Sequence, residues 1–242
     1  DANPRTVVVL SHGGVLRLAP LDGVPAIVDG ALLGQAGGAA LADVLYGAVN
    51  PSGRLTETVP LRLQDSPAHL DFPGEHGHVR YGEGLFVGYR WYDARGLEVT
   101  FPFGHGLSYT TFEHSDLRLT AGPDGITATV TVTNTGTRTG HEVVQLYTAL
   151  PDSAVARPQR ELKGFAVVEV APGEQAQATV LLRRQDLAYW DTRIDDWVLE
   201  PGEYVVWSAA SSRDLRVSAT VVLAGDEVSL PLTPESTFAE IL

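Results

Sequence analysis

The side chains that could do chemistry near the start of the chain are Ser11 and His12. They directly follow the β-branched run at 6–10, which predicts a strand. Open α/β sheets place ligands at the carboxyl ends of their strands, so both residues are candidates for lining a ligand or a domain contact. A serine nucleophile activated by histidine is not indicated, because no nucleophile-elbow sequence surrounds the pair.

A single carboxylate and a histidine cluster follow further along the chain. Glu83 lies between two glycines in an aromatic segment, and we interpret it as a structural hydrogen-bonding residue rather than as a catalytic acid. His69, His76 and His78 share a loop rich in proline and glycine, without the converging acidic or cysteine ligands that zinc requires. We predict no metal site and no cofactor, and we take His76 as a candidate substrate-binding residue.

Composition restricts the classes of partner. The formal net charge is −13, which disfavours nucleic acid and anionic membranes because both require basic side chains. No run approaches the roughly 18 apolar residues of a membrane span. The chain lacks Cys and Met and starts at Asp1, so we expect it to be part of a longer polypeptide.

The elements that would position these residues form an α/β layer. Apolar runs at 6–10 and 25–29 predict strands, and 38–46 predicts a helix that Gly47 ends. A glycine-rich segment at 34–38 lacks the Lys-Ser/Thr ending of a phosphate loop, so we interpret it as a packing segment. Two strands cannot cover themselves, and we expect an upstream segment to complete the sheet.

The second half of the chain has the pattern of an all-β domain. Strands are predicted at 126–132, 143–147, 165–170, 176–182, 204–208 and 215–223, with Pro-Gly turns at 172–173 and 201–202. This spacing is typical of an immunoglobulin-like or fibronectin-III-like β-sandwich without the cysteine pair. Trp190, Trp197 and Trp207 could stack on sugar rings, although such residues more often fill a core or a domain contact.

The predicted fold class is therefore α/β followed by all-β. Residues 1–111 would form the second half of a layered α/β sandwich domain with its linker, and 112–225 the fibronectin-III-like domain. Residues 226–242 would form a tail, in which 237–242 could begin a short helix.

Eight segments resemble, in order and at similar spacing, the sequences of family 3 β-glucosidases. They include NPSGRL at 50–55, YGEGLFVGYRWY at 81–92 and FPFGHGLSYT at 101–110; the others are 34–47, 132–136, 142–147, 160–165 and 211–215. The chain is identified by this resemblance as the C-terminal portion of such an enzyme. Two positions differ from the family pattern: Leu33 stands where proline is usual, and Ala36 where glutamate is usual.

The resemblance implies a retaining β-glucosidase that acts on terminal β-D-glucosyl residues with two carboxyl groups. Both the nucleophile Asp and the acid/base Glu would lie upstream of Asp1, so this chain would hold no catalytic residue and would be inactive alone. Its partner would be the barrel-containing part of the polypeptide, either in the same chain or as a separate chain. A secreted or periplasmic location is expected. The alternatives are a carbohydrate-binding or scaffold module, or a parent specific for β-xylosides or N-acetylhexosaminides.

Overall fold

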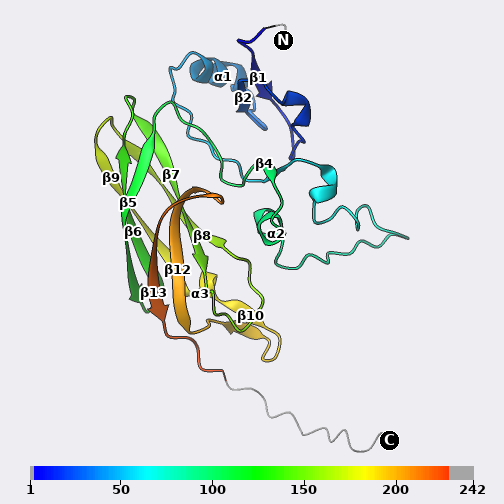
Figure 1. Cartoon of the computed structure of the whole chain (residues 1–242), viewed down its shortest axis with the longest axis vertical. Coiled ribbons are helices and arrows are strands. Elements are labelled where there is room, and N and C mark those ends of the chain that lie inside the picture. The colour runs from blue at the N-terminus through cyan, green and yellow to red at the C-terminus, as the bar shows by residue number, and fades with distance from the viewer. Residues whose placement is uncertain (1–2, 229–242) are drawn as a thin grey trace, which may run out of the picture.

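The N-terminal part of the computed structural model, which describes residues 3–228, begins with two parallel strands (Figure 1). Strand β1 (Val7–Leu10) pairs with β2 (Ala26–Asp29), and the 3₁₀ helix η1 (Ala19–Leu21) lies between them. Within the described residues this sheet has two strands only. Val7 and Val9 are 46% and 39% exposed. The sequence-based expectation of an incompletely covered sheet is therefore confirmed.

Helix α1 (Gly37–Leu45) follows the two strands and confirms the predicted helix within one residue at each end. Gly47 adopts a φ of 74°, a left-handed conformation that glycine allows without a steric penalty just beyond a helix. The short strands β3 (Val59–Pro60) and β4 (Val99–Phe101) pair further on. They were not predicted, since runs of two and three residues show no periodicity.

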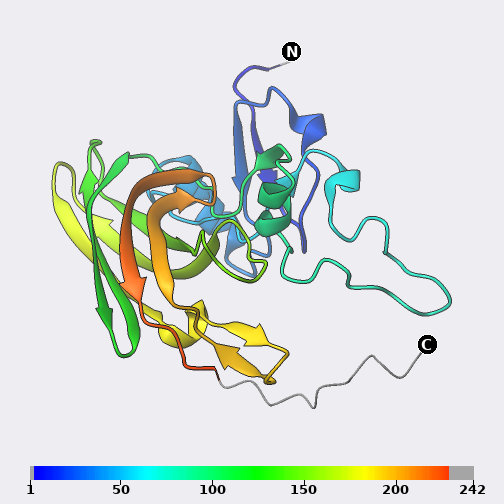
Figure 2. The ribbon, with the colours of Figure 1, turned by 60° about the horizontal axis from the view of Figure 1, so that its bottom comes forward.

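A long excursion separates β3 from β4. It contains the 3₁₀ helix η2 (Leu63–Asp65) and helix α2 (Tyr89–Ala94), and the chain between them extends away from the rest of the molecule in both ribbon views (Figures 1 and 2). Helix α2 was also unexpected from the sequence. It begins after Gly88, which has a positive φ of 55°.

Two antiparallel sheets form the sandwich and confirm the predicted fold class. One sheet has the order β5-β6-β9 and the other the order β13-β12-β7-β8. Their bounds are β5 (Phe112–Gly122), β6 (Gly125–Asn134), β7 (Gly140–Ala149), β8 (Glu161–Val170), β9 (Gln175–Arg183), β12 (Gly202–Ser211) and β13 (Asp214–Leu223). The core lies between the sheets, where alternate residues of β6 are buried: Ile126, Ala128, Val130 and Val132.

Only one of the two predicted Pro-Gly turns forms. Gly173 has a φ of 74°, and the N–H of Glu174 donates to the carbonyl of Ala171 over 3.0 Å, as a tight turn requires. Gly202 instead begins strand β12. The prediction of a turn there is wrong because Gly202 already pairs with Leu223 in the β12–β13 ladder.

A small hairpin projects from the end of the sandwich. Strands β10 (Tyr189–Asp191) and β11 (Asp196–Val198) form it, just after the short helix α3 (Arg184–Leu187). Trp190 and Trp197 on this hairpin are 45% and 53% exposed. Of the alternatives left open by the sequence, these two residues therefore do not fill the sandwich core, whereas Trp207 packs beside a buried cluster.

Several polar contacts tie the N-terminal part to the sandwich. A guanidinium nitrogen of Arg54 lies 2.7 Å from a carboxylate oxygen of Glu142 on β7, and both side chains are at least nine-tenths buried. The amide of Gln145 donates to the carbonyl of Gly104 over 3.0 Å. The hydroxyl of Tyr89 accepts the backbone N–H of Leu162 over 2.7 Å. These bonds hold the two parts in one arrangement.

No helix in residues 3–228 is long and apolar enough to cross a membrane. The proposed short helix at 237–242 lies outside the described residues. Asp226, placed by the sequence at the start of the tail, binds the sandwich: its carboxylate accepts the backbone N–H of Leu199 over 2.7 Å and pairs with Arg184 over 2.6 Å.

Candidate functional site

His12 and Asp29 form a pair at the carboxyl ends of β1 and β2. The Nε2 atom of His12 lies 3.0 and 3.1 Å from the two carboxylate oxygens of Asp29. The parallel register places Leu10 opposite Asp29, so the residues that follow each strand meet at the same edge. The backbone N–H of Ala31 donates to Asp29 over 3.0 Å and fixes the carboxylate.

The His12 ring is held in an unusual electrostatic environment. Its hydrogen bond to the Asp29 carboxylate raises the pKa of His12 above the ordinary histidine value, against the opposing effect of burial. The other ring nitrogen, Nδ1, is buried and has no hydrogen-bond partner in residues 3–228. The ring is therefore held by Asp29 at the carboxyl ends of the two strands.

Ser11 takes part in a different contact. Its hydroxyl donates to the carbonyl of Ala31 over 3.2 Å, and the His12 N–H donates to the same carbonyl over 3.2 Å. No hydrogen bond within the described residues joins the Ser11 hydroxyl to the His12 ring. The pair is thus arranged to shape the loop after β1 and not to activate a serine nucleophile.

His76 lies in the excursion between η2 and α2, within the turn that Glu75 and His78 close through two backbone hydrogen bonds of 2.9 Å. It is exposed and has a positive φ of 50°. No group of three potential metal ligands occurs within residues 3–228. That His76, Ser11 and His12 contact the substrate remains a prediction.

Glu83 does not behave as the sequence suggested. Its carboxylate makes no hydrogen bond to residues 3–228, although its backbone carbonyl accepts the N–H of Phe86 over 3.0 Å. The interpretation of the Glu83 side chain as an inter-element hydrogen-bonding residue is therefore wrong within the described chain.

Sequence reasoning overlooked Asp29 as a site residue. The signal was present, because Asp29 directly follows the apolar run of the second strand, just as Ser11 follows the first. Because the two strands are parallel and Leu10 lies opposite Asp29, Asp29 lies next to the residues that follow the first strand, including His12. Sequence reasoning also missed the contact between Arg54 and Glu142, for which no local pattern exists.

Comparisons with known proteins identify the class of protein that this architecture defines. Residues 1–109 match the model of the glycosyl hydrolase family 3 C-terminal domain, and residues 142–212 match that of the fibronectin type III-like domain. The chain therefore belongs to glycoside hydrolase family 3, as its C-terminal portion, and the resemblance found in the sequence is confirmed.

Individual relatives agree with this assignment. The chain is 46% identical to the exo-α-(1→6)-L-arabinopyranosidase of Bifidobacterium breve, over 99% of this chain and 32% of that protein. It is 47% identical to thermostable β-glucosidase B of Acetivibrio thermocellus, over 91% of this chain and 31% of that protein. The chain thus spans about a third of the length of these relatives.

A solved structure gives the same result. The family 3 β-glucosidase of Bifidobacterium adolescentis superposes with a TM-score of 0.91 at 48% identity, over 98% of this chain and 36% of that one. A second, the β-glucosidase of Kluyveromyces marxianus in complex with glucose, has a TM-score of 0.87 at 43% identity, over 92% and 27% of the two chains. Both the α/β part and the sandwich therefore follow the family 3 fold.

Proposed function

We propose that this chain is the C-terminal portion of a retaining β-glucosidase that removes terminal, non-reducing β-D-glucosyl residues. One observation carries the proposal: β-glucosidases match almost the whole chain, yet it spans only about a third of their length. The nucleophile Asp and the acid/base Glu, which in retaining enzymes lie roughly 5–5.5 Å apart, are assigned to the upstream part of the polypeptide. No residue of this chain is assigned to catalysis.

The role proposed for this chain is to complete and brace the domain beside the active site. The exposed face of β1 offers apolar area that an upstream strand or helix would cover. His12 and Asp29 lie at the strand ends, where they would meet the barrel-containing part. The buried contact between Arg54 and Glu142 fixes the sandwich against this layer, so that the layer can hold its position.

A second substrate is favoured by a specific observation. Two Bifidobacterium relatives, 46% and 45% identical, are exo-α-(1→6)-L-arabinopyranosidases, and each is matched over 99% of this chain. An α-L-arabinopyranosidase of the same family is therefore the other candidate. Both activities cleave a glycosidic bond at a terminal sugar, so the same experiment can separate them.

The test combines mass spectrometry under denaturing conditions with hydrolysis assays on one purified native sample. We expect mass spectrometry to find this sequence within, or together with, a polypeptide about three times as long. We expect the same sample to release nitrophenol from nitrophenyl β-D-glucopyranoside. Faster release from the α-L-arabinopyranoside would favour the second candidate. Nitrophenyl β-xyloside and N-acetyl-β-glucosaminide test the specificities that the sequence left open.

Other outcomes would overturn the enzyme proposal. A 25.9 kDa species that folds alone, hydrolyses none of these substrates and binds sugar would indicate a carbohydrate-binding module. A long polypeptide without any glycosidase activity would indicate a scaffold built on the fold. The secreted or periplasmic location remains a proposal drawn from the family resemblance, and cell fractionation with an antibody to this chain would test it.

A further inference from the structure

Two tryptophans stand side by side on the outer face of the β10–β11 hairpin. Trp190 and Trp197 occupy directly opposite positions of the antiparallel pair, so both side chains lie on the same face. Their ring centroids are 5.6 Å apart and the ring planes meet at 80°. About half of each side chain is exposed, although burying an indole is strongly favourable. The chain thus leaves two of its four tryptophans largely exposed, whereas the other two are partly buried.

The opposite face of the hairpin is anchored to the sandwich. Val198 and Asp191 are buried there, and their positions alternate with those of the two tryptophans. The guanidinium of Arg157 lies over the Tyr189 ring, 5.2 Å from its centroid. Hydrogen bonds from Arg193 hold the Asp191 carboxylate and keep its pKa well below the usual value. The tryptophans therefore project from a firmly held platform.

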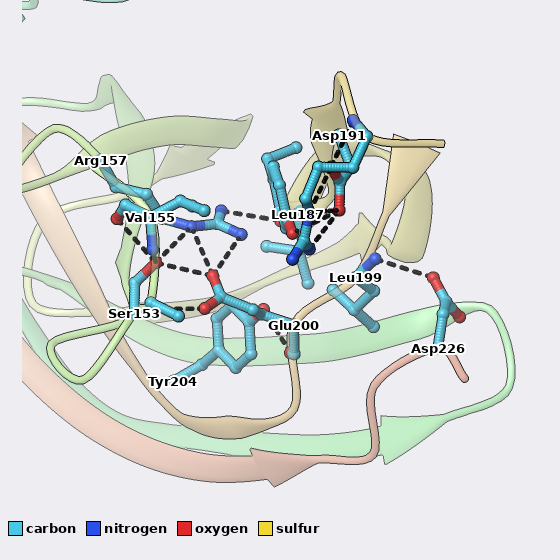
Figure 3. A network of polar contacts seen from close by, with 12 residues as sticks. Ser153, Val155, Arg157, Leu187, Asp191, Leu199, Glu200, Tyr204 and Asp226 are labelled. Carbon is cyan, nitrogen blue, oxygen red and sulfur yellow. Dashed lines mark hydrogen bonds and ion pairs between the residues drawn. The ribbon is translucent and has the colours of Figure 1, made fainter. Parts of the chain in front are cut away.

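A buried polar network extends this anchoring into the sandwich (Figure 3). Two nitrogens of Arg157 donate to one oxygen of Glu200 over 3.0 and 3.1 Å, and a third donates to the Leu187 carbonyl over 3.1 Å. Ser153 donates to the same carboxylate over 2.6 Å. Burial alone would raise the pKa of Glu200, but these hydrogen bonds outweigh it and lower the pKa. Because this network already holds the hairpin in place, little conformational entropy of the protein is lost when a ligand binds there.

The surroundings of the tryptophan pair favour a neutral, hydroxyl-bearing ligand. Asp195 and Asp196 are exposed beside it, and the whole chain carries a net charge of −13, which repels anionic partners. The cores of protein–protein interfaces are depleted of aspartate, so exposed carboxylates at the turn beside the rings argue against a protein partner. Aromatic faces pack against the C–H faces of pyranose rings, while carboxylates accept hydrogen bonds from sugar hydroxyls.

We propose that the β10–β11 hairpin is a carbohydrate-binding surface, on which Trp190 and Trp197 stack against a neutral glucan chain. Asp195, exposed in the turn that joins the two strands, accepts hydrogen bonds from its hydroxyl groups. The ligand is a polymer or oligomer rather than a monosaccharide, since two ring planes that meet at 80° cannot both stack on the face of one pyranose ring. The choice of a β-linked glucan rests on the function proposed above.

The test is affinity electrophoresis of the natural polypeptide that contains this chain, in native gels with and without soluble mixed-linkage β-glucan. We expect the wild type to be retarded, and the double variant W190A/W197A to show an apparent Kd at least tenfold higher. The double variant W190F/W197F keeps aromatic faces and should retain most of the retardation. Leu181→Ala, a similarly exposed apolar residue on β9, is the matched control and should behave as the wild type.

Two results would overturn the proposal. One is unchanged retardation of W190A/W197A. The other is a fall of several degrees in its melting temperature together with aggregation, which would show that the pair is a packing contact within the natural polypeptide. Hydrolysis of nitrophenyl β-glucoside, measured on the same samples, separates the proposals. Lost retardation with intact hydrolysis supports the binding surface, whereas retardation without hydrolysis would leave the surface standing and refute the proposed enzyme.

Discussion

Replacing Arg54 by methionine would leave the buried carboxylate of Glu142 without its guanidinium partner. The pair is close, at 2.7 Å, and the two side chains are 9% and 4% exposed. Glu142 would keep only His114, whose Nε2 atom lies 3.4 Å from its other oxygen. Methionine fills much of the volume of the arginine stem, so the change tests charge more than packing.

The expected loss is large because the remaining charge stays buried. Removing one partner of a buried ion pair typically costs about 3–5 kcal/mol of unfolding free energy. For a chain of 150–250 residues this corresponds to a fall of about 6–20 °C in the melting temperature. The arginine also donates to the carbonyls of Ser52 and Gly53 over 3.0 and 3.1 Å, so the segment after α1 loses its anchor as well.

Urea unfolding followed by tryptophan fluorescence measures this loss, with Arg216→Met as the control. Arg216 pairs with Asp214 at the surface, where the two side chains are 41% and 48% exposed, and the expected loss is at most about 1 kcal/mol. The double variant R54M/E142L removes the uncompensated charge and should regain the part of the stability lost to that charge, but not the part lost with the hydrogen bonds to Ser52 and Gly53. The reasoning is refuted if R54M loses no more stability than R216M, or if the double variant is no more stable than R54M.

Three further changes test other contacts. Gly104→Ala would press a methyl group into a side-chain amide on β7 at a φ of 81°, and should lose at least about 1–3 kcal/mol of unfolding free energy in urea. Tyr89→Phe removes the acceptor of the Leu162 N–H and should cost about 1–3 kcal/mol in the same assay. Asp29→Asn removes the group that raises the pKa of His12, so the melting temperature of the wild type should exceed that of the variant mainly at low pH.

The sign of the pH effect follows from the direction of the pKa shift. Because the folded-state pKa of His12 is raised, the stability that the pair adds is fully present below the unfolded value of about 6.5. It is lost as the pH rises through the folded pKa. A difference between wild type and Asp29→Asn that grows with pH would contradict the assignment.

Gly104→Ala has a matched control variant, and Tyr89→Phe leaves the packing of the ring in place. Gly96→Ala has a similar φ of 60° but no atom near the added methyl group, so a Gly104→Ala loss no larger than that of Gly96→Ala would contradict the steric argument. Tyr89→Phe keeps the ring that stacks on Phe103 at 4.9 Å. A loss near zero would mean that the Leu162 N–H finds another partner.

Elements with a long local pattern could be predicted from the amino-acid sequence. The alternation of β6 predicted a strand with one buried face, and the structure buries its alternate residues. Gly47 predicted the end of α1 and the Pro-Gly pair at 172–173 predicted a turn, and both form because they need only local backbone conformations. Eight motifs at family-like spacing were sufficient to identify the family, and the boundaries at 111 and 225 remain predictions.

The tertiary structure alone decided which distant side chains meet. Arg54 and Glu142 lie 88 residues apart, and nothing near either residue indicates the other. The outward direction of Trp190 and Trp197 depends on which face of a three-residue strand packs on the sandwich. Two or three residues are too few to show a periodicity, so the buried face is set by the elements that pack there and not by the local sequence.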